Sequence, residues 1–356
     1  MQNELTDFFN EISGFYDSNL PFVVYRKPNE ASIKAYAQKN KELNHLHSFK
    51  EMGFVFAPFN TNDSKIIFPS YKCNMLTIEI SEKYPLEIKG NKSSFNVNSS
   101  EKTKEDYIEL VQRGIDFIKN KNAKKVVLSR KEILECDNID VINTFKDILN
   151  NYKNAFVYLW FHPSVGLWMG ATPERLINVY QSKFKTMALA GTQLYKNSTD
   201  VIWNGKERKE QQFVTDFILE NIRDTVDNIK VSNAYTIKAG NLLHIRTDIS
   251  GVLKAADMLE SLIGSLHPTP AVLGLPKISA TKFIIENEGY DRAYYAGYLG
   301  ELNIESSTNL FVNLRCMQLN KNTASIYVGG GITKDSNSNK EWEETISKAE
   351  VMKKVL

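Results

Sequence analysis

The sequence predicts an α/β (α+β) protein with large, mainly antiparallel sheets and flanking helices. Short apolar runs bounded by Pro, Asn, Asp and Lys come in groups, which is typical of strands joined by turns. Segments with helical periodicity also come in groups, without the regular strand and helix alternation of a parallel sheet. The chain has 356 residues, 42% of them apolar, which is enough to bury a substantial core.

The first hundred residues are expected to hold a short amphipathic helix and a group of strands. The apolar runs that predict these strands lie at residues 22–25, 54–58, 65–68 and 76–80. Residues 85–104 are rich in Lys, Asn and Ser, and we expect them to connect this part to the rest of the chain.

The remainder is expected to contain two further groups of strands separated by helices. A helix is predicted over residues 107–119, and Lys125 then opens a short apolar strand. The next strands are predicted at residues 156–160, 167–171, 175–180 and 184–189. Helices are expected over 206–226, 255–263 and 279–286, and final strands over 309–319 and 324–329.

Charge and cysteine content argue against several classes of protein. A net charge of +2 gives no electrostatic footprint for nucleic acid or a membrane. Cys73, Cys136 and Cys316 are odd in number and widely spaced, so neither a disulfide framework nor a zinc knuckle is indicated. No run reaches the length of a membrane span, and the first residues lack a basic stretch. We expect a soluble cytoplasmic protein, and a monomer because no exposed apolar helix or heptad pattern is evident.

A glycine-rich segment ahead of the last helix is the first candidate binding site. Residues 329–331 are all glycine, and as a turn after an apolar strand they would let backbone N–H groups approach an anion. In the helix that follows, Glu341, Glu344 and Lys348 share the face that apolar residues continue. Inward-pointing carboxylates require a cation. The segment therefore predicts a site for an anionic ligand and a divalent metal, against the alternative of a plain connection and a solvated charged face.

Five other polar residues occupy positions where the pattern expects apolar ones. Glu174 follows a proline that breaks a strand, and it is either a general acid or a solvated turn carboxylate. Glu210 borders the apolar face of its helix, or is favoured there by the helix dipole. Lys125 opens a buried strand, where a snorkelling lysine is the alternative. His244 is either a core or a working histidine, and Arg315 either grips a ligand carboxylate or forms a structural ion pair.

Seven segments, in order, resemble the chorismate-utilising enzyme family, whose members make isochorismate, salicylate, anthranilate and aminodeoxychorismate. The resemblance runs from about residue 105 to the C-terminus. The segments are KVVLSR at 125–130, GATPE at 170–174, ALAGT at 188–192, LHPTPA at 266–271, YAG at 295–297, VNLR at 312–315 and the block at 329–348. The resemblance implies a single chorismate-binding domain over residues 1–356, with sheets facing each other across a cleft. Within it, residues 105–356 would form the catalytic core, and residues 1–100 match only loosely.

The resemblance also implies a Mg²⁺ site beside a pocket for chorismate. Glu210 and Glu344 are similar in position to the family's metal ligands, with Glu341 close by and ordering bound waters. Mg²⁺ suits such a site because it takes few carboxylates and keeps several waters. It would hold the ring carboxylate of chorismate, whose conjugated diene accepts electrons when a nucleophile attacks the ring. The residues implied to bind the substrate are Gly191, Thr192, His244, Ala271, Arg315, Gly329, Gly331 and Lys348.

The residue at position 125, Lys125, indicates that the nucleophile is water. Members of the family that add water have a lysine at this position as general base, whereas the aminating members have glutamine. This agrees with the chemistry, because water is a poor nucleophile near neutral pH and requires a base. Glu174 matches the residue that protonates the departing C4 hydroxyl.

Two further positions favour isochorismate as the product. Members that make aminodeoxychorismate have a nucleophilic lysine where this chain has Ala190, and salicylate-forming members tend to have threonine where it has Ala271. Salicylate synthase, which also eliminates pyruvate, remains the alternative enzyme. The destination of isochorismate would be menaquinone or a catechol siderophore.

Departures from the family pattern leave other possibilities open. Many relatives have Glu-His where this chain has Glu210 and Gln211, which puts the surroundings of the metal ligand in question. A non-catalytic chorismate-binding homologue is opposed by the joint presence of base, acid and metal carboxylates. A nucleotide-binding module is opposed by the absence of a GxxxxGK[ST] loop.

Overall fold

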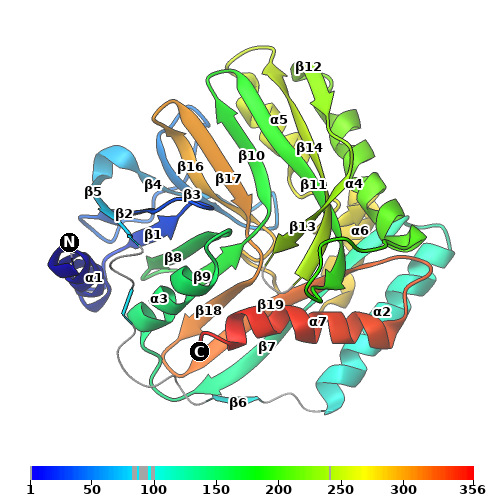
Figure 1. The fold of residues 1–356 in the computed structure, drawn as a ribbon, viewed down its shortest axis with the longest axis horizontal. Helices are drawn as coiled ribbons and strands as arrows, with labels where there is room; N and C mark the ends of the chain where they lie inside the picture. Colours follow the sequence, from blue (N-terminus) through cyan, green and yellow to red (C-terminus); the bar gives the residue numbers. More distant parts are fainter. Residues whose placement is uncertain (1, 82–85, 88–94, 98–100, 240–241) are drawn as a thin grey trace.

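The computed structural model describes residues 2–81, 86–87, 95–97, 101–239 and 242–356 (Figure 1). These residues include seven α-helices and one short 3₁₀ helix. The α-helices are α1 (Gln2–Asp17), α2 (Glu101–Lys119), α3 (Val141–Asn151), α4 (Gly205–Ile222), α5 (Met258–Leu266), α6 (Lys277–Asn287) and α7 (Ser338–Lys353), and the 3₁₀ helix is η1 (Ser70–Lys72).

Two large antiparallel sheets form the body of the molecule, as the sequence predicts. The first has ten strands. Their spatial order is β15 (Gly274–Leu275), β7 (Lys125–Cys136), β19 (Thr323–Ile332), β18 (Cys316–Asn320), β9 (Gly166–Thr172), β8 (Phe156–His162), β1 (Phe22–Arg26), β2 (Ser32–Gln38) and β5 (Cys73–Glu79), with β6 (Phe95–Val97) paired to β7.

The second sheet has nine strands. Their order is β12 (Val226–Val231), β14 (Leu242–Leu253), β11 (Lys183–Leu194), β10 (Arg175–Tyr180), β17 (Ser307–Val312), β16 (Tyr298–Ile304), β3 (Gly53–Ala57) and β4 (Ile66–Pro69), with β13 (Tyr235–Ala239) paired to β14.

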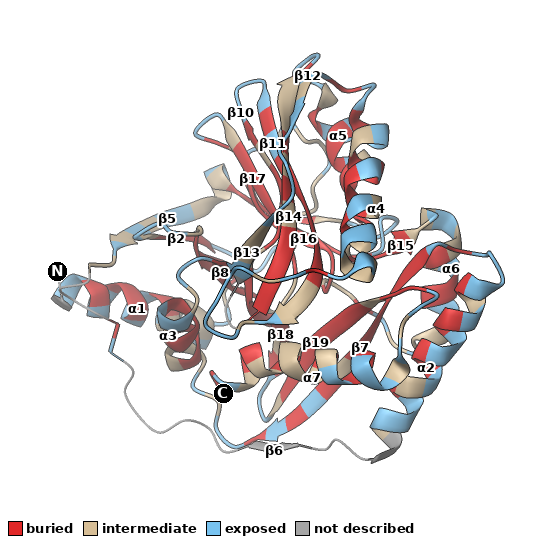
Figure 2. Cartoon of the chain, turned by 45° about the vertical axis from the view of Figure 1, so that its right-hand side comes forward, coloured by how far each residue is buried: buried red, intermediate tan, exposed pale blue. Residues whose placement is uncertain are grey.

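The central strands of the first sheet, such as β1 and β8, are buried on both faces and are continuous apolar runs, whereas the edge strand β5 is exposed or half-buried (Figure 2). In β8, Tyr158 and Trp160 join a core cluster that also contains residues of the second sheet, such as Phe56 and Phe311. The Phe56 and Trp160 rings lie 4.7 Å apart. The alternate residues of β8, such as Leu159, pack in a second cluster with residues of α1, α3 and α7. Burying a large apolar side chain in this way contributes about 1.5–3 kcal/mol.

Two of the places where the chain crosses between the sheets lie next to each other. The chain leaves the first sheet after β9 and enters β10 of the second through Pro173 and Glu174, and it returns between β17 and β18 through residues 313–315. The crossings are tied together, because the Ala171 N–H donates to the Arg315 carbonyl (3.0 Å) and the Val312 N–H donates to the Glu174 carbonyl (2.9 Å). Glu174 and Arg315 therefore stand side by side where the two sheets meet.

Several sequence predictions are corrected by these elements. The single strand predicted over residues 309–319 is two strands in different sheets, because Arg315 has a positive φ of 47° that ends the extended backbone. The three glycines predicted as a turn belong to β19, where they pair with β7. Strands β12, β13, β14 and β16 were not predicted, and the helix predicted to Val226 ends at Ile222.

The connector predicted over residues 85–104 lies largely outside the described residues, although β6 and the start of α2 fall within it. Among the described residues, no helix is both long and apolar enough to cross a membrane.

Candidate active site

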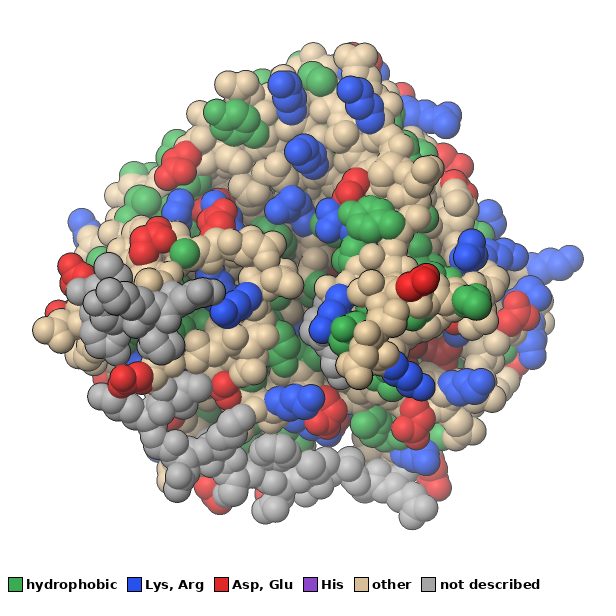
Figure 3. Space-filling view, viewed as in Figure 1, with side chains coloured by type: hydrophobic (Ala, Val, Ile, Leu, Met, Phe, Trp, Pro, Cys, Tyr) green, Lys and Arg blue, Asp and Glu red, His purple; other side chains and the backbone are tan. Residues whose placement is uncertain are grey.

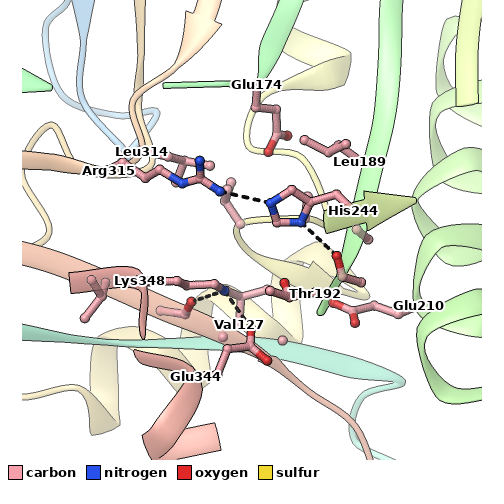
Figure 4. Close-up of a pocket in the computed structure, with 18 of the residues that line it drawn as sticks. Val127, Glu174, Leu189, Thr192, Glu210, His244, Leu314, Arg315, Glu344 and Lys348 are labelled. Atoms are coloured by element: carbon pink, nitrogen blue, oxygen red, sulfur yellow. Dashed lines mark hydrogen bonds and ion pairs between the residues drawn. The ribbon is translucent and has the colours of Figure 1, made fainter. Parts of the chain in front are cut away.

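A pocket opens where the crossings between the sheets face the first turns of α4 and the middle of α7. The space-filling view shows a hollow near the centre of this face, with Lys and Arg side chains around it (Figure 3). The close-up places Glu174 and Arg315 on one wall and Glu344 and Lys348 on the other (Figure 4). Strands β11, β14 and β19 complete the lining.

Glu174 is a buried carboxyl at this wall, with 5% of its surface exposed. Burial raises the pKa of Glu174 to about 7, although the nearby charges of Lys125, Arg315 and Lys348 act in the opposite direction. Its place at the crossing follows from Pro173, which cannot donate to a sheet ladder and ends β9. A carboxyl with this pKa can hold a proton near neutral pH and release it to a substrate.

Arg315 is held toward the pocket by His244. The Nδ1 of His244 lies 2.8 Å from the Gly191 carbonyl, which can only accept, so Nδ1 carries the proton. Nε2 is then free to accept from the Arg315 guanidinium at 2.9 Å. Burial, helped by the charge of Arg315, lowers the pKa of His244 to about 3, so the ring stays neutral in this chain of contacts. His244 thus positions the guanidinium of Arg315, the group predicted to bind a ligand carboxylate.

Lys125 lies beneath the pocket, fully buried, with Nζ 2.9 Å from Oε1 of Glu210. This is an ion pair, but the Lys125 ammonium has no hydrogen-bond acceptor within the described part of the chain. Burial would raise the pKa of Glu210, yet the Lys125 charge and those of Lys206 and Lys348 outweigh it and hold this pKa below its usual value. A buried lysine with a single carboxylate partner is an expensive arrangement that points to a function.

Two more carboxylates approach the same place from α7. The helix begins where the Asn337 side chain accepts from the Lys340 N–H, a cap that the Ser/Asn-rich linker predicts. One turn apart, Glu341 pairs with Lys206 of α4 at 2.7 Å, and Glu344 pairs with Lys348 at 2.7 Å. Lys348 also donates to the Gly329 carbonyl at 2.8 Å. The ion pair of Lys206 with Glu341 therefore connects α4 to α7 beside the pocket.

The glycines of β19 leave room for these carboxylates. A Cβ at Gly330 would lie 3.3 Å from Oε2 of Glu341 and 3.9 Å from Oε1 of Glu344. A Cβ at Gly331 would overlap Oε1 of Glu210. Glycine suits these positions because the three carboxylates converge on this strand. The glycines therefore make room for side chains within β19 and do not form the predicted turn.

The three carboxylates fit the chemistry of Mg²⁺, which takes carboxylate oxygens and water. Glu210, Glu341 and Glu344 supply oxygens around the space that Gly330 and Gly331 leave open. Each carboxylate faces a lysine, and in the described ranges no three His, Cys, Asp or Glu side chains gather closely enough to hold a metal ion as they stand. A bound metal ion would thus have to replace the lysine ammonium groups as the partner of these carboxylates.

Most residues predicted to form the site line this one pocket. They are Glu174, Gly191, Thr192, Glu210, His244, Ala271, Arg315, Gly329, Gly331, Glu344 and Lys348. Lys125 and Glu341 do not line it; both are buried immediately behind it, against Gly331 and Gly330 respectively.

Two charged residues of the pocket lining were missed by the sequence analysis. Lys206 and Glu207 line the pocket from the first turn of α4, and Oε2 of Glu207 is buried without a hydrogen-bond partner among the described residues. The sequence could have indicated them, because residues three and four positions before Glu210 lie on the same face of the helix.

Gln211, which differs from the common family pattern, has a structural role. It is buried, and its Nε2 donates to Thr215 at 2.9 Å and to Thr247 at 2.8 Å. The side chain therefore fastens α4 to β14 directly beside Glu210, which holds the carboxylate in place.

Comparison with protein families matches residues 65–356 to the chorismate binding enzymes. Among curated proteins, the chain is 27% identical to "Salicylate biosynthesis isochorismate synthase" of Pseudomonas aeruginosa over 69% of this chain and 53% of that protein. It is 30% identical to "Isochorismate synthase EntC" of Escherichia coli over 54% of this chain and 51% of that protein. The chain thus spans about half the length of these curated relatives.

Solved structures with the same fold cover nearly the whole chain. A putative 2,3-dihydroxybenzoate-specific isochorismate synthase, DhbC, from Bacillus anthracis has a TM-score of 0.79 at 21% identity, covering 94% of this chain and 96% of that one. MenF, the menaquinone-specific isochorismate synthase of Escherichia coli, has a TM-score of 0.78 at 20% identity, covering 94% and 88%. At these identities the comparison establishes the fold.

Proposed function

The chain belongs to the family of chorismate binding enzymes, and we propose that it is an isochorismate synthase. In this proposal it converts chorismate to isochorismate by adding water at C2 with loss of the C4 hydroxyl. The observation that carries it is the presence at one pocket of a buried lysine, Lys125, and a buried carboxyl, Glu174, whose pKa burial raises to about 7. A base and an acid of this kind on one substrate ring are what replacement of a hydroxyl by water requires.

Lys125 is the proposed general base. It accepts a proton from water as the water oxygen bonds to C2, and the ring electrons shift toward the leaving group at C4. In the structure its Nζ lies 2.9 Å from Oε1 of Glu210, so the proposed base directly contacts a proposed metal ligand.

Glu174 is the proposed general acid. It gives its proton to the C4 hydroxyl, which then leaves as water rather than as hydroxide. Its neutral form is available because burial raises its pKa to about 7. After the reaction Lys125 carries one more proton and Glu174 one fewer, so proton exchange with solvent restores the starting state and no net proton is consumed.

The two substrate carboxylates are proposed to bind opposite walls of the pocket. Arg315, held by His244, is available to one of them, and Lys348 with the backbone of β19 lies near the other. Mg²⁺ held by Glu210 and Glu344, with Glu341 close by, would draw electron density toward the ring carboxylate and so assist attack at C2. Supporting this set, all three carboxylates converge on Gly330 and Gly331.

We place the protein in the cytoplasm as a monomer, and its product in menaquinone biosynthesis, with siderophore biosynthesis as the alternative. Complementation of strains that lack either pathway's isochorismate synthase distinguishes the two destinations.

The test of the activity is incubation of the purified protein with chorismate and Mg²⁺, followed by chromatography. Isochorismate is the expected product, and it should not form when the metal is chelated. Release of pyruvate with salicylate would instead identify a salicylate synthase. Recovery of unchanged chorismate under all conditions would contradict an enzymatic role.

A further inference from the structure

Lys206 is the one pocket cation for which the proposed reaction has no use. It extends from the first turn of α4, and its Nζ lies 2.7 Å from Oε1 of Glu341 on α7. Burial would lower its pKa, but the charges of Glu341, Glu210 and Glu344 together raise it above the usual value. The Lys206 ammonium thus contacts Glu341 directly and lies in the field of the other two carboxylates that the proposed function assigns to the metal.

Among the three lysines that face these carboxylates, Lys206 is the least confined. Its side chain is 32% exposed, whereas Lys348 is 21% exposed and Lys125 is fully buried. Lys348 is also held by the Gly329 carbonyl at 2.8 Å. Returning Lys206 to water therefore costs least of the three, because its side chain is the most exposed.

A second cavity also borders the side chain of Lys206. This cavity, of about 410 Å³, borders α4, and Lys206 and Glu210 line both it and the active-site pocket. Its lining includes four other lysines, Lys121, Lys124, Lys209 and Lys334, and also the carboxylate of Asp335. Asp335 is thus a carboxylate on the second cavity that could receive an ammonium displaced from Glu341.

We propose that Lys206 is an internal counter-cation, which pairs with Glu341 beside the proposed metal ligands in the metal-free protein and is displaced when a divalent metal binds. The inference rests on the proposed function, since it takes Glu210, Glu341 and Glu344 as the metal site. Lys206 is a positioning residue: it keeps like charges together before the metal arrives, and it sets the affinity for the metal. Without a cation, three carboxylates in one buried place would repel each other strongly.

Titration calorimetry with Mg²⁺ alone tests the role of Lys206, with no chorismate present. Lys206→Met should bind Mg²⁺ about two- to fivefold more tightly than the natural protein, the size expected when a partly exposed ion pair no longer has to be broken. The metal-free variant should also melt at a lower temperature, and Mg²⁺ should restore its stability, because Glu341 has lost its partner. A merely structural lysine would lower stability without tightening metal binding.

Lys209→Met is the matched control. Lys209 is on the same helix and lines the second cavity, with its ammonium 5.9 Å from the Phe213 ring centroid, so its removal changes the net charge equally and should leave the Mg²⁺ affinity unchanged. Lys206→Gln serves as a second variant if Lys206→Met does not fold.

Three results would overturn the inference. Equal or weaker Mg²⁺ binding by the Lys206 variants would show that Lys206 does not compete with the metal. Equal tightening in Lys209→Met would reduce the effect to net charge. Absence of Mg²⁺ binding in every folded protein would reject the metal site of the proposed function itself, whereas the first two results leave that site intact.

Discussion

Replacing Glu174 with glutamine should remove activity and at the same time stabilise the protein at alkaline pH. Glutamine has nearly the shape of a protonated glutamate, so the packing at the crossing between β9 and β10 is kept. It has no proton to give to a departing hydroxyl, so formation of isochorismate should be lost. The gain in stability is the less obvious result, and it follows from the environment of the side chain.

The magnitude comes from the pKa of Glu174, which stands at about 7 in the folded protein against a usual value of 4.5. Because the folded state favours the neutral form, the stability that this group contributes is complete below pH 4.5 and is lost as the pH rises through about 7. For a side chain that is 5% exposed, the loss is about 3 kcal/mol. Glutamine carries no charge at any pH and escapes this loss.

The assay is denaturation by urea at about pH 5 and about pH 8.5, where Glu174 is mostly neutral and mostly ionised respectively. From the lower to the higher pH, Glu174→Gln should gain up to about 3 kcal/mol in the free energy of unfolding relative to the natural protein. Glu220→Gln, at an exposed position of α4, is the control and should show no such gain. An equal stability difference at both pH values would refute the placement of a neutral Glu174 in the pocket.

Three other substitutions test the remaining groups. Lys125→Gln should abolish hydration while chorismate still binds in the presence of Mg²⁺, and normal turnover would reject Lys125 as the base. Glu344→Ala should remove activity together with the response to Mg²⁺, as followed by titrating the metal against product formation; an unchanged titration would exclude Glu344 as a ligand. Gly331→Ala should weaken Mg²⁺ binding by tenfold or more, because the new Cβ overlaps Oε1 of Glu210 and lies 2.9 Å from Cε of Lys125; calorimetry showing natural affinity would contradict the tight approach of β19 to these side chains.

The sequence predicts the fold class because the central strands of the first sheet are buried on both faces. Strands such as β1 and β8 are then uninterrupted apolar runs, and they are found within a residue or two of their predicted bounds. Strand β12 was missed because it is mostly exposed and carries no apolar pattern. The division of residues 309–319 was missed because local pattern does not reveal that the backbone turns at Arg315 to change sheets.

The candidate site could be predicted as a set of residues but not as a set of contacts. The order of motifs is enough to bring Glu174, Glu210, Arg315 and Glu344 into one pocket. The pairing of Lys206 with Glu341 joins residues far apart in the chain, and only the packing of α4 opposite α7 brings them together. The role of the glycines was also out of reach, since it depends on side chains that approach β19 from other elements.

The two hydrogen-bonded crossings that carry Glu174 and Arg315 form one wall of the pocket. The Thr172 hydroxyl donates to the Val312 carbonyl at 2.6 Å, and backbone bonds on either side lock the same two segments together. Because these bonds join the backbone segments that carry Glu174 and Arg315, we expect the two side chains to keep their relative placement. We expect the pocket to widen more easily between α4 and α7, which the ion pair of Lys206 and Glu341 connects through side chains alone.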